Sequence, residues 1–148
     1  MHPREFDGTA GKPGSQFTGS AYPYLTMAQT DGVTINTVDF TPGARTHWHQ
    51  HEHGQIIQVL AGRGLVCAGG EVHVLRVGDT VWCPPDERHW HGAAPDSFLV
   101  HTAISLGRTE WAEPVDDDAY ARSPIDHAPP RAPAHARPHD GEVATDVR

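Results

Sequence analysis

The sequence predicts an all-β barrel or sandwich made of one domain. Short segments rich in β-branched and aromatic residues recur from Tyr22 to Leu106, turn residues separate them, and none of them reads as a helix. The chain has 148 residues, which is enough to bury a hydrophobic core but leaves no room for a second domain of ordinary size. We therefore expect a single β domain over residues 20–122.

The segment before this domain predicts an N-terminal arm. Gly, Pro and Ser recur over residues 1–19 without a hydrophobic period, and the arm could pack on a neighbouring subunit. The segment has neither the apolar centre of a signal peptide nor the Arg-rich pattern of a transit peptide. Cys67 and Cys83 are the only cysteines, too few for a disulfide framework. These features predict a cytoplasmic protein.

The domain is predicted to hold eight or more short strands. Gly69 and Gly70 mark a tight hairpin, because glycine adopts a positive φ at little steric cost. Pro84 and Pro85 end another strand, since proline cannot donate a ladder hydrogen bond. The clearest strand segments are 33–40, 55–60, 65–67, 72–75, 80–83 and 97–106.

One short helix is predicted after the strands, over residues 111–120. Pro114 or the following acidic residues would occupy its first turn, where the helix dipole favours negative charge, and Trp111 and Tyr120 would pack on the barrel. Prolines and charged residues dominate after Arg122, so this part cannot bury enough apolar area to offset the entropy of ordering. We predict a disordered tail over residues 123–148.

Charge and hydropathy restrict the class of partner. The net charge is -8 and the basic residues are scattered, which argues against a nucleic-acid-binding surface. No apolar run is long enough to span a bilayer, so a membrane partner is not expected either. A small molecule is the predicted partner. The unusual feature is histidine, with 12 residues against 11 lysines and arginines together.

Two histidine clusters predict a metal site. Residues two apart on a strand project from the same face, so His49 and His51 can meet one ion, and Gln55 keeps the same parity. His89 and His91 form a second His-x-His element on a separate strand, as a site inside a barrel requires. Neutral imidazoles suit Mn, Fe, Ni, Cu or Zn, and the spacing alone leaves these metals open.

The first cluster resembles the first motif of the cupin family. Gly43 is followed after five residues by His49-x-His51, then after three residues by Gln55 and after six by Gly62. Cupins usually have Glu where this chain has Gln55. The resemblance implies a jelly-roll barrel, also called a double-stranded β-helix.

The second cluster resembles the second cupin motif. Gly78 is followed after five residues by Pro84, then by Asp86 and His89, with Asp86 where Gly is usual and without the customary final Asn. The resemblance covers about residues 31–106. It implies four metal ligands: His49, His51, Gln55 and His89.

A narrower resemblance points to the bacterial cupin hydroxynitrile lyases. It rests on residues 40–46, on Trp48-His49-x-His51-x-x-Gly54-Gln55, and on residues 89–95. That group binds manganese through three His and one Gln, so the resemblance implies Mn²⁺, with Fe²⁺, Ni²⁺ and Zn²⁺ as alternatives. It also implies a homodimer or homotetramer.

The expected chemistry follows from the neutral ligand set. Gln55 in place of Glu leaves the ion with its full double charge, which favours polarisation of a carbonyl oxygen or stabilisation of a developing anion. His91 shares the face of His89, and His101 lies on the last long strand, so either could act as the catalytic acid or base near neutral pH. The predicted reaction is cleavage of a cyanohydrin to an aldehyde and cyanide.

Two other functions stay open at this point. The same ligands could hold Fe²⁺ in a dioxygenase or another oxidoreductase, or serve a non-catalytic metal-dependent binding protein. Trp48, Trp82 and Trp90 are interpreted as core or pocket-wall residues, and Arg45 as a partner in a structural ion pair.

Overall fold

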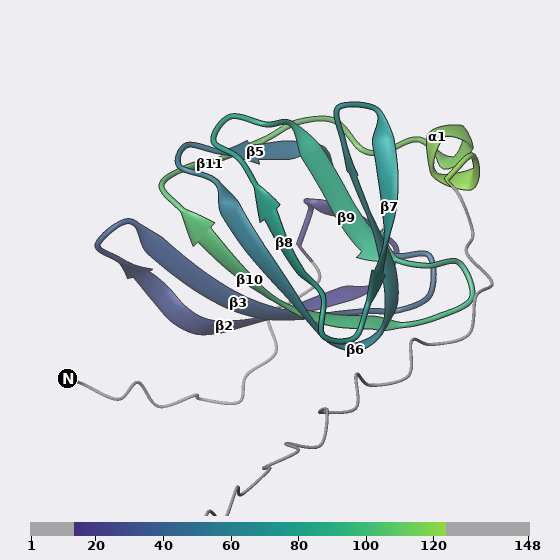
Figure 1. The fold of residues 1–148 in the computed structure, drawn as a ribbon, viewed down its shortest axis with the longest axis horizontal. Helices are drawn as coiled ribbons and strands as arrows, with labels where there is room; N and C mark the ends of the chain where they lie inside the picture. Colours follow the sequence, from purple (N-terminus) through teal and green to yellow (C-terminus); the bar gives the residue numbers. More distant parts are fainter. Residues whose placement is uncertain (1–13, 124–148) are drawn as a thin grey trace, which may run out of the picture.

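Eleven strands and one short helix make up residues 14–123, the part of the chain that the computed structural model describes (Figure 1). All strand pairs are antiparallel, and the helix follows the last strand, so the all-β prediction is confirmed. The elements are β1 (Phe17–Thr18), β2 (Ala21–Thr30), β3 (Val33–Phe40), β4 (Arg45–Thr46), β5 (His49–His51), β6 (Gln55–Ala68), β7 (Glu71–Arg76), β8 (Thr80–Cys83), β9 (His89–Ala93), β10 (Leu99–Leu106), β11 (Thr109–Trp111) and α1 (Asp117–Ala121).

The strands form two sheets that share the long strand β6. Sheet I has the order β2-β3-β10-β6-β8, and sheet II has the order β1-β4-β9-β6-β7, with β5 between β9 and β11. The first half of β6 pairs with β10 and β8, and its second half pairs with β9 and β7. This arrangement is the nearly closed jelly-roll barrel that the sequence motifs implied.

The sequence predicted two strands where the structure has the single strand β6, and this expectation was wrong. Gly62 has φ 77°, a conformation that glycine adopts without strain, and β6 passes from sheet I to sheet II at this residue. A Cβ at Gly62 would overlap the carbonyl oxygen of Phe98. The glycine therefore bends one continuous strand instead of ending it.

The hairpin after β6 is confirmed. Cys67 pairs with Val72 and Ala68 with Glu71, so Gly69 and Gly70 form a two-residue turn. Both glycines have positive φ, 58° and 83°, as a tight hairpin of this kind requires.

Two hydrophobic clusters stabilise the fold. The larger one lies between the sheets, because its members come from strands of both: Ala21, Val38, Phe40, Ala44, Val59, Val66, Leu75, Ala93 and Leu99. The second cluster uses the opposite face of β6 and contains Leu65, Cys67, Trp90, Val115 and Tyr120. Helix α1 therefore covers the outer face of sheet II.

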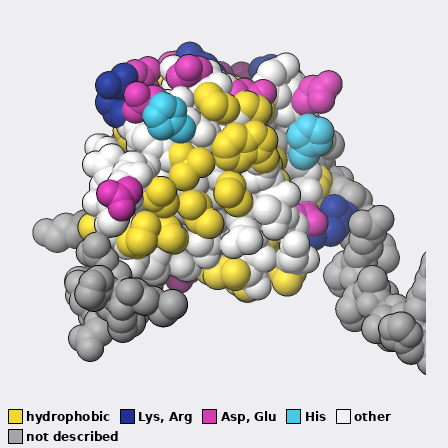
Figure 2. Space-filling view, turned by 60° about the vertical axis from the view of Figure 1, so that its left-hand side comes forward, with side chains coloured by type: hydrophobic (Ala, Val, Ile, Leu, Met, Phe, Trp, Pro, Cys, Tyr) yellow, Lys and Arg dark blue, Asp and Glu magenta, His cyan; other side chains and the backbone are white. Residues whose placement is uncertain are grey.

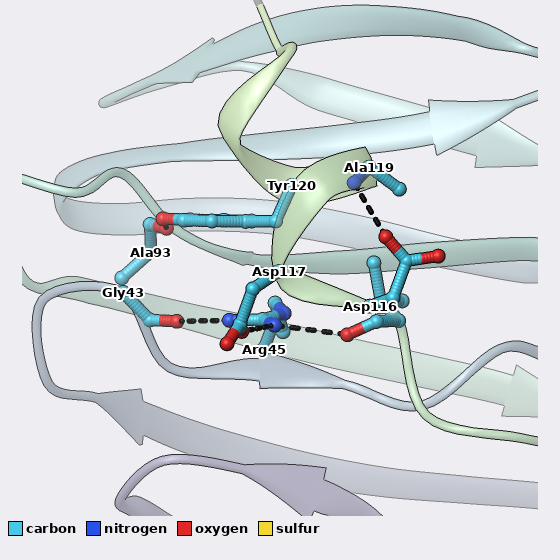
Figure 3. A network of polar contacts seen from close by, with 8 residues as sticks. Gly43, Arg45, Ala93, Asp116, Asp117, Ala119 and Tyr120 are labelled. Atoms are coloured by element: carbon cyan, nitrogen blue, oxygen red, sulfur yellow. Dashed lines mark hydrogen bonds and ion pairs between the residues drawn. The ribbon is translucent and has the colours of Figure 1, made fainter.

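A buried arginine ties the helix to the barrel (Figure 3). The Arg45 guanidinium donates to the Val115 carbonyl oxygen at 2.8 Å and forms an ion pair with Asp117 at 2.6 Å. It also lies 4.5 Å from the centre of the Tyr120 ring, whose hydroxyl donates to the Ala93 carbonyl oxygen at 2.6 Å. The expected structural ion pair of Arg45 is confirmed.

The helix begins later than predicted. Asp116 caps its N-terminus by accepting from the Ala119 backbone N–H at 2.6 Å, and acidic residues fill its first turn as expected. Trp111 was predicted in this helix, but it belongs to β11, where it pairs with His49 of β5. Strand pairing therefore overrides the local helix signal before Pro114.

The predicted arm and tail are described only in part. Within 14–19, Phe17 and Thr18 pair with β4 as strand β1. Residues 1–13 of the predicted arm and residues 124–148 of the predicted tail lie outside the described residues. In the described part of the chain, no helix is long and apolar enough to span a membrane.

Candidate metal centre

Four histidines from two paired strands meet inside the barrel. His49 and His51 come from β5, and His89 and His91 come from β9, with His49 directly opposite His89. The His49 ring centre lies 4.4 Å from that of His89, 5.1 Å from that of His51 and 5.2 Å from that of His91. All four side chains are buried. The structure thus brings both His-x-His elements to one place.

Hydrogen bonds orient these rings so that one nitrogen of each is left for the site. The His49 Nδ1–H donates to the His47 carbonyl oxygen at 2.9 Å, and the His89 Nδ1–H donates to the Glu87 carbonyl oxygen at 2.8 Å. A carbonyl oxygen can only accept, so the proton of each neutral ring lies on Nδ1 and the lone pair on Nε2. His51 Nδ1 lies 3.0 Å from Thr109 Oγ1, a hydroxyl that can accept from or donate to this nitrogen. Metal-ligating histidines are typically held this way.

The Gln55 side chain completes the cluster. Its Nε2 donates to Ser105 Oγ at 3.0 Å, and its Oε1 lies 3.0 Å from His89 Nε2. With the His89 proton on Nδ1, two lone pairs face each other across this distance, which a cation between them would stabilise. Adjacent ligand atoms at about 2.1 Å from one ion are about 3 Å apart at right angles, so the spacing fits shared coordination.

Burial keeps the cluster uncharged. It lowers the pKa of His49 well below the ordinary value and lowers the pKa of His51 to about 4, with His89 adding to both effects. Burial also lowers the pKa of His89. Neutral imidazoles are the form that binds a metal, so the lone pairs are available at neutral pH.

Two buried ring nitrogens of the histidine cluster have no hydrogen-bond partner and are available as metal ligands. Within the described part of the chain, the Nε2 atoms of His51 and His91 are buried and have no hydrogen-bond partner. The ligand atoms of His49, His89 and His91 lie within 4.8 Å of one another, so this buried triad could hold a metal ion. His51 and Gln55 add further donors beside it.

The two predicted acid or base histidines form a pair. His101 Nε2 lies 3.0 Å from His91 Nδ1, and both side chains are buried. Burial lowers the pKa of His101 to about 4, and burial together with His101 lowers the pKa of His91 well below its ordinary value. Both rings are therefore neutral, and one hydrogen joins them.

A cavity of about 140 Å³ lies against this cluster. His91 lines it, whereas His101 is not among its wall residues and reaches it only through His91. Among the described residues, no Asp or Glu side chain lines the cavity. Its walls are Phe17, Pro23, Thr34, Asn36, Val38, Phe40, Thr46, His49, His51, Gln55, His91, Ala103, Ser105, Thr109 and Trp111.

Sequence reasoning missed several of these wall residues. Ser105 could have been found, because it shares the alternating face of His101 on one strand. Thr109 and Trp111 gave no such signal, since they reach the site only by the pairing of β11 with β5. None of the three tryptophans singled out in the sequence lines the cavity: Trp90 is core, as expected, whereas Trp82 is 51 % exposed.

Both cysteines are buried free thiols. Burial raises the pKa of Cys67, and it raises the pKa of Cys83 to about 12. Neither thiol is activated as a nucleophile.

The chain matches a known domain family and is similar in sequence to a known enzyme. Residues 36–101 match the model of the cupin domain. The chain is 41% identical over 117 residues to the (R)-mandelonitrile lyase of Granulicella tundricola, and the match covers 74% of this chain and 89% of that enzyme.

Solved structures give the same fold. A cupin-like protein from Thermotoga maritima has 37% sequence identity and a TM-score of 0.74, over 80% of this chain and 97% of that chain. A cupin 2 conserved barrel domain protein from Rhodopseudomonas palustris has 18% identity and a TM-score of 0.60, over 82% of this chain and 87% of that chain, and supports the fold alone.

Removing the Ser105 hydroxyl is expected to weaken metal binding. Ser105→Ala leaves the Gln55 Nε2 group without its acceptor, so the amide is no longer held with Oε1 toward His89. We expect the dissociation constant for Mn²⁺ to rise roughly tenfold, the effect typical of losing a hydrogen bond to a metal ligand. Isothermal titration measures it. Ser20→Ala, at an exposed position, is the control, and equal affinity in both variants would contradict the role of Ser105.

The metal-free protein is expected to lose stability as the pH falls. His101 takes up a proton at about pH 4 in the folded chain, against its ordinary 6.5 when unfolded. The unfolded chain therefore binds more protons between these values, and the stability present above 6.5 is lost toward 4. His101→Gln should reduce this loss by about 3 kcal/mol. Urea unfolding at about pH 7 and about pH 4 measures it.

The control for this measurement is a histidine at the surface. His53 is exposed, so His53→Gln should leave the pH dependence unchanged. An equally steep loss in His101→Gln and in the unmodified chain would show that His101 does not contribute.

Proposed function

The chain belongs to the cupin family, and from this premise we propose that it is a metal-dependent lyase of the hydroxynitrile lyase type. Such an enzyme cleaves a small cyanohydrin to an aldehyde and hydrogen cyanide. The observation that carries the proposal is a buried histidine cluster beside a cavity whose described wall residues include no carboxylate. The name of the 41% identical relative supports the same reaction.

We propose that the ion is held by Nε2 of three histidines and Oε1 of Gln55. The orientation of the Nδ1 atoms and the spacing between Gln55 Oε1 and His89 Nε2 support this set. The proposed ligands are His49, His51, Gln55 and His89, and the proposed metal is Mn²⁺, with Fe²⁺, Ni²⁺ or Zn²⁺ as alternatives. The bound ion would supply a positive charge, undiminished by any ligand charge, that stabilises negative charge developing on the substrate.

His91 is the proposed acid and base. Its Nε2 is buried beside the cavity without a partner, so it can take the proton of the cyanohydrin hydroxyl. As the carbon–oxygen double bond forms, the bond to the nitrile carbon breaks and its electron pair leaves with cyanide. The proton on His91 Nε2 then passes to cyanide, which departs as hydrogen cyanide and returns the ring to its neutral state.

His101 acts through His91 in this scheme. When His91 carries the extra proton, its Nδ1–H donates to His101 Nε2, and a hydrogen bond from a charged donor is stronger than one from a neutral donor. This hydrogen bond holds the His91 ring in one orientation beside the cavity. It is a positioning residue, since it does not line the cavity.

The cavity suits an aromatic substrate of one ring. Its volume of about 140 Å³ is close to the roughly 150 Å³ at which a protein cavity accepts benzene. Phe17, Phe40 and Trp111 provide aromatic wall surface, and the Trp111 ring centre lies 4.6 Å from that of His49. A ring held against these side chains would direct its polar substituents toward the histidines.

We propose a cytoplasmic location and a homodimer or homotetramer as the working form. The two free thiols fit a reducing compartment. The uncovered apolar face of sheet I fits self-association.

The lyase proposal predicts release of cyanide from racemic mandelonitrile by the manganese-loaded protein, without uptake of oxygen. His89→Ala should abolish this activity by removing a ligand, and His91→Phe should lower kcat by about 100-fold or more, the usual contribution of a positioned acid or base. A cyanide assay measures the release of cyanide, and an oxygen electrode measures any uptake of oxygen. His53→Ala, at an exposed position in the same sequence cluster, is the matched control.

Two results would contradict the proposal. Oxygen consumption with phenolic substrates, and no cyanide release, would indicate an iron-dependent oxygenase at the same ligands. Ligand-induced thermal shifts without any turnover, and unchanged in His91→Phe, would indicate a binding protein.

Gln55→Glu is expected to separate metal retention from turnover. The carboxylate adds a negative charge to the ligand set, so the ion should be held more tightly, while its ability to stabilise charge on the substrate decreases. We expect a lower dissociation constant for Mn²⁺ and a kcat lowered at least tenfold. Equal or higher kcat in this variant would contradict the role assigned to the neutral amide.

A further inference from the structure

A row of large apolar side chains crosses the outer face of sheet I. The strand register places Trp82, Ile56, Ile104, Ile35 and Met27 directly opposite one another, one from each of the five strands. The alternate residues of β6 and β10, such as Ile57 and Ala103, are buried inside the barrel, so the row faces outward. Figure 2 brings the β2–β3 side of Figure 1 forward and shows hydrophobic side chains gathered in a band.

The rows beside it carry almost no charge. One neighbouring row runs through Thr80, Gln58, Thr102, Thr37 and Tyr24, and another holds Ala61, Val100, Asp39 and Tyr22. Val33 and Leu106 pair on the other side. Asp39 is the single charged residue among these positions, although the chain as a whole has a net charge of -8.

The face is large enough for a stable contact. Five strands spaced about 4.8 Å apart, with about eight residues each at about 3.3 Å, give roughly 600 Å² in projection. A stable interface buries about 800 Å² per partner, and side chains expose more area than their projection. Leu60 and Phe98, 52% and 53% exposed, extend the apolar surface. Patches of this size on a monomer usually mark an interaction site.

We propose that the outer face of sheet I binds a second copy of this chain, sheet against sheet. In a two-fold contact each patch meets its own copy, so charges of one sign would repel. A face that is nearly free of charge avoids this repulsion in an acidic chain, and sheet I offers one. A basic partner would instead select a face rich in carboxylates. The inference deepens the proposed oligomeric state and does not depend on the proposed reaction.

The proposed two-fold axis lies parallel to β10. β10 is the central strand of sheet I, and an axis parallel to it would place β8 of one copy over β2 of the other. Trp82, half exposed on β8, would then lie over Met27 of the partner, because both belong to the same row. This contact would occur twice, and Thr102 at the centre would lie near its own copy.

Two substitutions test the face by light scattering after size exclusion. At about 100 µM we expect the unmodified chain at twice its mass of 16.1 kDa, or at a larger even multiple. Ile104→Glu and Trp82→Glu place charges in the apolar row, and each should halve this mass by weakening association at least 100-fold. Val77→Glu, at a 64% exposed position in the β7–β8 connection, should leave the mass unchanged.

A cross-link locates the axis. Thr102→Cys should join to its own copy with a short bismaleimide, whereas Val77→Cys should not, and the buried Cys67 and Cys83 stay unreactive. A monomeric unmodified chain, or a multimer that persists in both glutamate variants, would overturn the proposal. Circular dichroism and Mn²⁺ binding check that the variants fold, and cyanide release tests the reaction separately.

Discussion

The proposed metal site depends on one contact: His89 Nε2 and Gln55 Oε1 lie 3.0 Å apart, and each presents a lone pair to the other. Backbone carbonyl oxygens hold the protons of His49 and His89 on Nδ1, so the Nε2 lone pair of either ring cannot be turned away without breaking a part-buried hydrogen bond. Burial also opposes protonation of these rings. A cation shared by His89 Nε2 and Gln55 Oε1 satisfies this geometry.

The fold provides this arrangement through strand register. The pairing of β5 with β9 sets His49 opposite His89, and the pairing of β6 with β10 sets Gln55 opposite Ser105. The short strand β11 then brings Thr109 to His51. His51 and Gln55 are thus oriented by residues distant in the sequence, whereas His49 and His89 are oriented by backbone carbonyl groups two residues away. The neutral side chains leave the charge of a bound ion undiminished, which suits stabilisation of a developing anion.

Much of this site could be predicted from the sequence because alternation along a strand is a local property. His49 and His51 share a face of β5 by parity, and the second His-x-His element gave a matching strand, whereas Gln55 begins β6 after a turn and is not placed by this alternation. The pairing of His101 with His91 could not be predicted, because it depends on how β10 of sheet I and β9 of sheet II are placed across the barrel interior. The predictions of where the helix begins and of two strands in place of β6 were wrong because local composition was outweighed. Strand pairing places Trp111 in β11, and the bend at Gly62 lets β6 continue without a break.

A crystal structure of the manganese-loaded chain, with the ion located by anomalous scattering, tests the ligand assignment most directly. The account predicts bonds from the ion to Nε2 of three histidines, His49, His51 and His89, and to Oε1 of Gln55, with His91 Nε2 facing the cavity without a bond to the metal. An ion bound to His91 in place of His51, or a Gln55 amide turned away from it, would contradict the account.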